Sequence, residues 1–244
     1  MTEDLAPYGR QRVVGVIQAR TGSSRLPNKV LLPIGGRAMI LRIYDRLRLC
    51  RELDEVVAAI PDTPDNDRLA LILEHAGVRY VRGPEEQLAT RLLMATAWQF
   101  TGADAIVRIT ADCPLIDPGA VDEMVVHWRQ HPQDYASNVH PTRTWPDGLD
   151  CEVFRTLLLA RLEGNAEAEP SPSEWVWERE HLVNALPSLV RLPSLAHLHW
   201  TVDTAEDLAG ARVVYARLPE GFTMAEVLAE FGEVSLQEIG KRHG

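Results

Sequence analysis

Apolar and polar positions follow two different rhythms along most of the chain. Short apolar runs, each about as long as a buried strand, are separated by longer segments whose apolar residues recur at the spacing of an amphipathic helix. The predicted strands are 13–18, 55–60, 79–82, 105–110, 135–139 and 197–202, and the predicted helices are 39–49, 65–75, 86–100, 120–130 and 205–218. This alternation predicts an α/β fold, with a mostly parallel sheet covered by helices on both faces.

Two aspartates follow predicted strands at the place where such a sheet binds its ligands, the crevice at the carboxyl ends of the strands. Asp112 ends the run RIT just before Cys-Pro, and Asp203 ends the run HWTV just before a predicted helix. If these carboxylates converge, they suit Mg²⁺, which combines one or two carboxylates with water and phosphate oxygens. The alternative is that each one only caps the next helix, a role for which Asp117 before Pro118 is the better candidate.

The first loop is basic although the chain is acidic, with a net charge of -10. From Leu5 to Tyr44 there are seven Arg or Lys residues and no Asp or Glu. Lys29 stands in the Gly/Ser-containing loop GSSRLPNK and is one of two lysines in the chain, beside 23 arginines. A compact ammonium at this place favours a phosphate oxygen as its ligand. The overall acidity argues against nucleic acid as the main partner, so the loop is interpreted as a site for a small anion.

Composition sets limits on the remaining classes. The 244 residues are 45% hydrophobic and 25% charged, which suits one large α/β domain over 1–244. We expect a cytoplasmic protein without a membrane partner, because no apolar run approaches the roughly 18 residues of a membrane span and the N-terminus has no signal-like core. The three cysteines lie far apart without a CxxC pair, so neither a disulfide framework nor a cysteine zinc site is supported.

Five segments, in the same order, resemble one enzyme family. They are IQARTGSSRLPNKVL, RITADCPLIDP, WPDGLDCEVF, EREHLVNAL and WTVDTAEDL. Together they resemble the spore-coat-polysaccharide F type of cytidylyltransferase, a relative of the CMP-acylneuraminate and CMP-KDO synthetases, from about Val13 to about Tyr215. The resemblance implies a Rossmann-like, glycosyltransferase-A-type nucleotidyltransferase fold. It also implies transfer of CMP from CTP to a sugar or sugar acid in surface polysaccharide synthesis, pyrophosphate release, Mg²⁺ dependence and a homodimer.

The same resemblance implies roles for individual residues. The catalytic residues are Lys29, Arg20 and Asp112, and the metal ligands are Asp112 and Asp203. The nucleotide-binding residues are Ala19, Arg20, Thr21, Gly22, Ser23, Ser24, Arg25, Lys29 and Arg108. Physical chemistry agrees for the loop, because a Gly/Ser turn leaves N–H groups free to bind an anion and fixed cations stabilise charge on the departing pyrophosphate.

The segment 140–190 breaks the alternation of strands and helices, and the resemblance implies that it is a sugar-facing and dimerisation insertion. Its candidate acceptor-binding residues are Asp147, Asp150, Glu152, Arg179 and His181. An Arg fork suits a carboxylate, which favours an anionic acceptor, whereas the three acids suit hydroxyls or an amino group. The stretch 164–173 is expected to be a flexible surface loop without an assigned function.

Several other readings are weaker. The first loop lacks the second glycine and the hydroxyl of a P-loop, and no GxGxxG follows the first strand. His127 and His131 have a zinc-compatible spacing without an evident third ligand, and Cys113 has no identifiable base that would make it a nucleophile. Transfer from another nucleoside triphosphate or to a non-sugar acceptor, and a non-catalytic CTP-binding subunit, remain as alternative functions.

Overall fold

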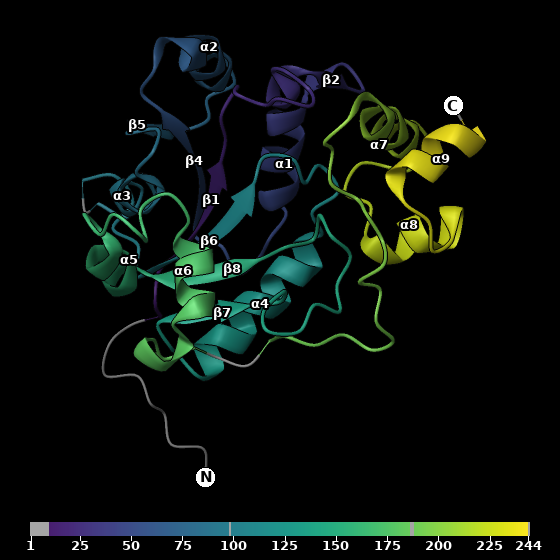
Figure 1. Ribbon diagram of the computed structural model, residues 1–244. Coiled ribbons are helices and arrows are strands. Elements are labelled where there is room, and N and C mark those ends of the chain that lie inside the picture. Colours follow the sequence, from purple (N-terminus) through teal and green to yellow (C-terminus); the bar gives the residue numbers. More distant parts are fainter. Residues whose placement is uncertain (1–9, 98, 186–187, 244) are drawn as a thin grey trace.

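The computed structural model describes residues 10–97, 99–185 and 188–243 (Figure 1). Its centre is a six-stranded sheet with the order β5-β4-β1-β6-β8-β7. The strands are β1 Val13–Gln18, β4 Glu55–Pro61, β5 Tyr80–Gly83, β6 Ala105–Thr110, β7 Tyr135–Ser137 and β8 Glu152–Arg155. Strands β5, β4, β1 and β6 pair in parallel, and β8 is antiparallel to both of its neighbours. The predicted mostly parallel α/β sheet is therefore confirmed.

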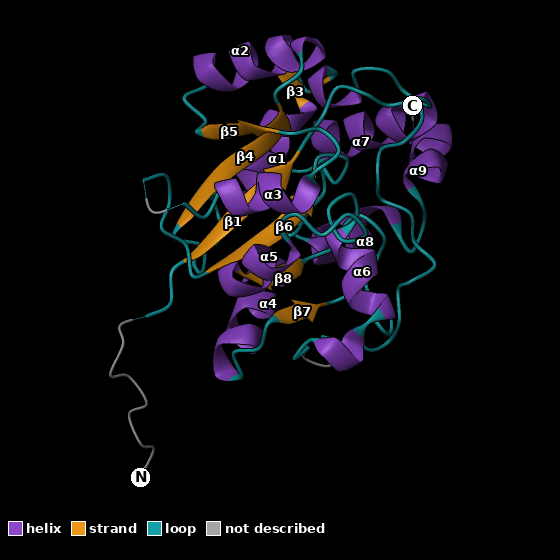
Figure 2. Ribbon diagram, turned by 60° about the vertical axis from the view of Figure 1, so that its left-hand side comes forward, coloured by secondary structure: helices purple, strands orange, loops and turns teal. Residues whose placement is uncertain are grey.

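Helices cover both faces of the sheet (Figures 1 and 2). One face packs against α1 Met39–Leu47, α2 Asp67–His75, α4 Pro118–Gln130, α7 Ala205–Arg217, α8 Met224–Phe231 and α9 Leu236–His243. The other face packs against α3 Leu88–Met94, α5 Thr156–Leu162 and α6 Pro172–Glu178. Short elements complete the chain: the hairpin β2 Pro33–Ile34 with β3 Arg37–Ala38, and the 3₁₀ turns η1 Lys29–Leu31, η2 Pro64–Asn66 and η3 Glu180–Leu182.

Strand β1 shows why its sequence is apolar throughout. Val13 and Ile17 belong to the larger core on one face, and Val14 and Val16 belong to the smaller core on the other. All four side chains are fully buried. Because successive side chains point to opposite faces, a strand covered on both sides needs apolar residues at every position.

Two predicted elements need correction. The segment 197–202 is not a strand of the sheet: it makes one isolated bridge, between Asp147 and His199, although its side chains do alternate between exposed and buried. Hydrophobic alternation reports a half-buried extended chain, and a partner strand must also be available. The predicted helix 86–100 is shorter, because α3 ends at Met94 and the chain turns there. Trp98, within the predicted helix, lies outside the described residues.

The chain order produces a switch point between β1 and β6. From β1 the chain moves through β4 to β5 on one side, and β6 then returns to the other side of β1. Gln18 and Thr110 are register partners at the carboxyl ends of these two strands. Connections that leave in opposite directions open a crevice there, which is where open α/β sheets bind ligands.

Candidate active site at the switch point

The basic loop after β1 is held open by contacts at its two ends. The Asn28 amide donates to the Thr21 carbonyl at 3.2 Å, and Asn28 adopts a left-handed conformation with φ 58°. The Thr21 amide donates to Oδ1 of Asn66 at 3.0 Å, which ties the loop to η2. Among the described residues, the amides of Gly22 to Arg25 donate no hydrogen bond to the protein. Their free N–H groups can therefore bind an anion.

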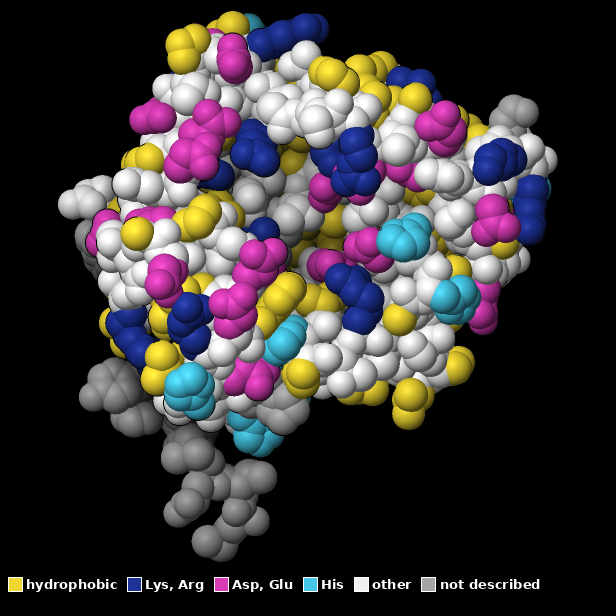
Figure 3. Space-filling model, in the orientation of Figure 1, with side chains coloured by type: hydrophobic (Ala, Val, Ile, Leu, Met, Phe, Trp, Pro, Cys, Tyr) yellow, Lys and Arg dark blue, Asp and Glu magenta, His cyan; other side chains and the backbone are white. Residues whose placement is uncertain are grey.

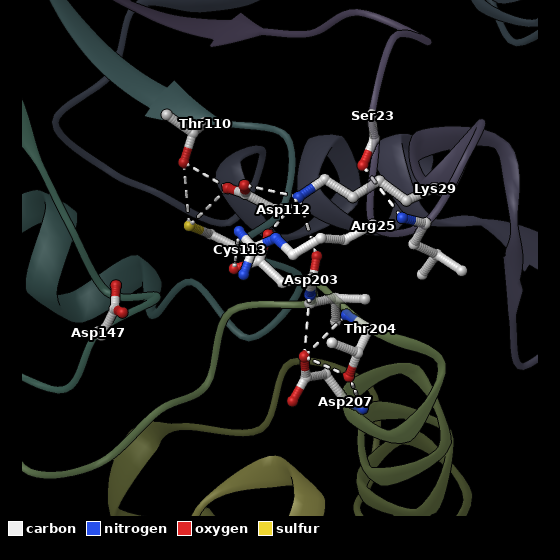
Figure 4. A network of polar contacts seen from close by, with 12 residues as sticks. Ser23, Arg25, Lys29, Thr110, Asp112, Cys113, Asp147, Asp203, Thr204 and Asp207 are labelled. Atoms are coloured by element: carbon white, nitrogen blue, oxygen red, sulfur yellow. Dashed lines mark hydrogen bonds and ion pairs between the residues drawn. The ribbon is translucent and has the colours of Figure 1, made fainter.

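Lys29 joins Asp112, which follows β6, to Asp203, which follows the extended segment 197–202 (Figure 4). Its Nζ donates to Oδ2 of Asp112 and to Oδ1 of Asp203, both at 2.9 Å. Arg25 forms an ion pair with the other oxygen of Asp203 at 3.0 Å. The structure thus brings Lys29 together with Asp112, which is 83 positions away in the sequence, and with Asp203, which is 174 positions away.

The pKa values follow from this arrangement. Burial alone would lower the pKa of Lys29, but Asp112 and Asp203 outweigh it and hold the pKa above its ordinary value of 10.5. Burial alone would raise the pKa of Asp112, but Lys29 and the Thr110 hydroxyl hold it below the ordinary 3.8. At neutral pH the lysine is therefore cationic and the Asp112 carboxylate is ionised.

A cavity of about 310 Å³ opens over these groups. Its walls include Gln18 at the end of β1 and Arg20 after it, the loop 22–25, Thr110 at the end of β6, and Asp112. In the space-filling view the same face of the molecule is hollowed, with dark blue basic side chains above and below the hollow and acidic and histidine side chains beside them on its lower and right margins (Figure 3). We call this space the phosphate cavity, because free amides and cations converge on it.

The carboxylate pair suits a divalent cation that shares its coordination with phosphate. Asp112 and Asp203 both reach the same ammonium group, so their oxygens converge on one point. Within the described part of the chain, no three His, Cys, Asp or Glu side chains come together as a metal site. Two carboxylates fit Mg²⁺, which uses few protein ligands, better than they fit a structural zinc site with four.

Arg108, predicted to bind the nucleotide, and Glu152, predicted to bind the acceptor, form an ion pair with each other. Glu152 is 5% exposed, bound by Arg108 and by the Tyr135 hydroxyl, the latter at 2.5 Å. Nε of Arg108 donates to Gln18 at 2.6 Å. Neither residue lines the phosphate cavity. They form an ion pair in the interior, between the neighbouring strands β6 and β8. Leaving one of these charges unpaired would lower the free energy of unfolding by about 3–5 kcal/mol.

Two predicted acceptor residues, Asp150 and Arg179, pair with neighbouring side chains outside the predicted set. The guanidinium group of Arg143 donates to both carboxylate oxygens of Asp150, at 2.6 and 2.8 Å. Arg179 binds Glu167 at 2.7 Å and Glu178 at 2.9 Å. These guanidinium groups already have carboxylate partners, which lowers their value as receivers of a substrate carboxylate.

The other two predicted acceptor residues differ in their surroundings. His181 lies exposed on η3. Asp147 lines a second cavity and forms an ion pair with His199 at 3.0 Å.

The stretch 164–173 is anchored, contrary to the expectation of a flexible loop. Glu169 is 4% exposed and accepts hydrogen bonds from the Gly164 amide at 2.7 Å and from the Thr90 amide at 2.9 Å. The Thr90 hydroxyl also donates to it, at 2.5 Å. Ala168 is fully buried beside it. A single buried acid in a Glu/Ala/Pro/Ser-rich stretch is indistinguishable by composition from an exposed one, so only packing reveals the anchor.

Cys113 is a packed thiol. It is 1% exposed, and burial together with the neighbouring Asp112 raises its pKa well above the ordinary value. A thiol that stays protonated is a poor nucleophile. The geometry therefore agrees with the interpretation that Cys113 packs beside the site.

Two residues that position the site, Thr110 and Asn66, have no role in the sequence interpretation, whereas the resemblance implies an outer-shell role beside the metal for Asp207. The Thr110 hydroxyl donates to Oδ1 of Asp112 at 2.6 Å, and Asn66 receives the loop amide described above. Oδ2 of Asp207 accepts from the amides of Asp203 and Thr204, at 3.1 and 2.8 Å, in a capping box that opens α7. The T-x-x-D spacing was a readable signal for that cap. The Asn66 contact had none, since its partner is 45 residues away.

Comparison with known proteins identifies the family. The family model described as Cytidylyltransferase matches residues 14–192, which is most of the chain. This chain belongs to the cytidylyltransferase family. It is 28% identical over 222 residues to the spore coat polysaccharide biosynthesis protein SpsF of Bacillus subtilis, covering 85% of this chain and 88% of that one.

Two further relatives agree with this membership. The structure of a cytidylyltransferase from Leptospira borgpetersenii superimposes with a TM-score of 0.82 at 27% identity, covering 91% of this chain and 95% of that one. An 8-amino-3,8-dideoxy-manno-octulosonate cytidylyltransferase of Shewanella frigidimarina is 31% identical over 127 residues, about half of each chain. The predicted family, nucleotidyltransferase fold and enzyme class are confirmed.

Proposed function

We propose that this chain transfers CMP from CTP to a hydroxyl of a sugar or sugar acid and releases pyrophosphate, in the synthesis of a surface polysaccharide precursor. The observation that carries the proposal is the phosphate cavity, where Arg20, Arg25 and Lys29 face Asp112 and Asp203 at the switch point. Membership of the cytidylyltransferase family supports the nucleotide. The names of the Bacillus and Shewanella relatives support a sugar-like acceptor.

The loop after β1 is proposed to bind the triphosphate. The free amides of Gly22, Ser23, Ser24 and Arg25 suit the β- and γ-phosphate oxygens, and the exposed Arg20 and Arg25 side chains add charge. Ala19 and Thr21 are buried and fix the loop's exit from the strand. Lys29, held at the strand ends, is placed to stabilise charge on the transferred phosphate.

Asp112 and Asp203 are proposed to hold Mg²⁺. When bound, the ion would neutralise phosphate charge and orient the triphosphate. The chain's own residues prepare this site: Thr110 orients Asp112, and Asp207 orients the backbone at Asp203.

The reaction is proposed to be one in-line displacement. The acceptor hydroxyl loses its proton to solvent and its oxygen forms a bond to the α-phosphorus, while the bond from that phosphorus to the bridging oxygen of pyrophosphate breaks. Arg20, Arg25 and the loop amides receive the charge that develops on the departing pyrophosphate. No covalent enzyme intermediate is needed, in keeping with the protonated, packed thiol of Cys113.

We also propose one domain over 1–244, acting as a cytoplasmic homodimer through the insertion 140–190. Leu182, Val190 and Leu192 are 50%, 50% and 80% exposed at or next to this segment, which supports an apolar contact there. Within the described residues, no helix has the length and apolarity to cross a membrane. Sedimentation equilibrium of wild type and Leu192→Asp tests the dimer, and a monomeric wild type would contradict it.

The decisive experiment is a pyrophosphate-release screen that crosses CTP, UTP, ATP and GTP with sugar acids, amino sugars, sugar phosphates and polyol phosphates in the presence of Mg²⁺. We expect turnover with CTP. Preference for another nucleotide would overturn the specificity and keep the transfer chemistry. CTP binding without pyrophosphate release for any acceptor would instead support a non-catalytic CTP-binding subunit.

A further inference from the structure

A second cavity of about 340 Å³ adjoins the phosphate cavity. The two share Arg25 and Asp203 as wall residues, so a molecule in the second cavity lies next to the proposed reaction centre. The other wall residues lie in the segment that leads into α7 and at the start of α9. Asp147, which bridges to His199 of that segment, completes the wall. We call this space the acceptor cavity.

The acceptor cavity is lined by oxygen-rich and acidic side chains. Its wall residues include Asp147, His199, Thr201, Asp207, Ser235 and Gln237. Its two cationic groups are already paired: Arg25 with Asp203 at 3.0 Å, and His199, when protonated, with Asp147 at 3.0 Å. The wall itself has three carboxylates, Asp147, Asp203 and Asp207, against Arg25 and, when protonated, His199; Lys29 and Arg143 contact Asp203 and Asp147 from outside it.

Asp207 is a wall residue in which one of the two carboxylate oxygens accepts all the hydrogen bonds from the protein. It is 7% exposed, and its Oδ2 accepts all of its hydrogen bonds, from the Asp203 and Thr204 amides and the Thr204 hydroxyl. Among the described residues, no donor reaches its Oδ1, which points away from that network (Figure 4). This oxygen belongs to a residue that lines the cavity, so it can accept a hydrogen bond from a ligand that brings an ammonium or a hydroxyl.

We infer that the acceptor cavity binds the acceptor sugar and selects one that carries an amino group among its hydroxyls. This inference rests on the proposed cytidylyl transfer. A carboxylate facing this wall would meet charges of the same sign, whereas an ammonium gains from Asp147 and Asp207. Arg143 and Arg179, the alternative receivers of a carboxylate, are engaged by Asp150 and by Glu167 and Glu178.

Two matched pairs of acceptors test the selection. Glucosamine is compared with glucose, and 8-amino-3,8-dideoxy-manno-octulosonate with 3-deoxy-manno-octulosonate, so that an amino group replaces a hydroxyl in each pair. With CTP and Mg²⁺ we expect the aminated member to have the lower KM in pyrophosphate release. Equal KM values within both pairs, or lower values for the hydroxyl members, would overturn the selection.

Charge reversal at Gln237 tests the location. Gln237 makes no side-chain hydrogen bond among the described residues and lines the acceptor cavity, so Gln237→Lys adds a cation there with little structural cost. We expect KM for the aminated acceptors to rise about tenfold, with the KM for CTP within about twofold. Gln130→Lys, an exposed site at the end of α4, adds the same charge elsewhere and should leave both values unchanged.

A binding measurement separates this inference from the proposed function. Saturation-transfer NMR with glucosamine and the aminated octulosonate, with CTP present, reports acceptor binding without turnover. Failure of both to bind wild type, or equal binding to Gln237→Lys, would overturn the acceptor cavity even if another acceptor released pyrophosphate. Binding that Gln237→Lys weakens would support the cavity even where the pyrophosphate assay fails.

Discussion

The phosphate cavity and the interior of the 140–190 region contain the same residue types, Arg and acidic side chains, with opposite consequences. Around the phosphate cavity, Asp112 and Asp203 keep about a quarter of their side-chain surface exposed and Arg25 keeps 65%. In the second region, Glu152 has 7% of its side chain exposed and is paired with Arg108, and Glu169 is buried with three donors.

This difference in exposure distinguishes the charged residues of the proposed binding site from the charged residues that stabilise the fold. Exposed charges with free amides beside them can exchange their protein partners for a ligand, whereas buried pairs with satisfied hydrogen bonds lose stability when they are disturbed. Substitutions around the phosphate cavity should therefore change activity in a folded protein. Substitutions of the interior pairs should change stability first.

The largest effect is expected at the carboxylate pair. Asp112→Asn or Asp203→Asn removes a proposed metal ligand. We therefore expect kcat/KM for pyrophosphate release to fall about 10²- to 10⁴-fold, which corresponds to a loss of several kcal/mol of transition-state stabilisation. The measurement is a steady-state pyrophosphate assay over a range of Mg²⁺ concentrations. Unfolding by heat should show both variants folded, and wild-type turnover in either one would remove that residue from the metal site.

Arg108→Met tests the opposite case. It leaves the buried Glu152 carboxylate without its guanidinium partner, so we expect a loss of about 3 kcal/mol or more in the free energy of unfolding. Denaturant titration measures this loss, and the double variant Arg108→Met/Glu152→Gln should recover part of it. If Arg108→Met were fully stable and instead raised the KM for CTP, Arg108 would be a nucleotide-binding residue as the resemblance implies.

Lys29 should affect activity less than its two carboxylate partners. Lys29→Ala is expected to reduce kcat/KM by roughly 2–4 kcal/mol, because a fixed cation near the transferred phosphate is lost. Lys29→Arg should restore only part of the activity, since a longer planar group cannot occupy the position 2.9 Å from both carboxylates. Full activity of the Arg variant would show that net charge alone is needed there.

The smallest effect in this series concerns the anchor of the 164–173 stretch. Glu169→Ala removes the acceptor for the amides of Thr90 and Gly164, and we expect a loss of about 1–3 kcal/mol in the free energy of unfolding. Glu163→Gln, an exposed acid nearby, is the control and should leave the midpoint of thermal unfolding unchanged. A stability equal to wild type in Glu169→Ala would restore the interpretation of a flexible loop.

The sequence by itself determined the mostly parallel sheet, the places of nine strands and helices to within two residues, and the phosphate loop. β1 and β6 have the predicted bounds, because a strand buried on both faces needs an unbroken apolar run and leaves a strong signal. The strand-end rule and the family motifs placed Asp112, Asp203 and Lys29 among the candidates, and the structure brings these three together. Local chemistry also identified Asp117 as a helix cap, where its side chain accepts from the Gly119 amide at 2.7 Å.

Only the tertiary structure decided how each charged residue is paired. Arg108, Glu152 and Arg179 were predicted as binding residues from residue type and motif. In the structure Arg108 pairs with Glu152, 44 positions away, and Arg179 pairs with Glu167, 12 positions away, and with its sequence neighbour Glu178. The pairing of a charge depends on burial and on which distant segment packs against it, and neither leaves a local pattern in the chain. The acceptor cavity has the same origin, since its walls meet only when the residues after β8 fold back beside the end of β6.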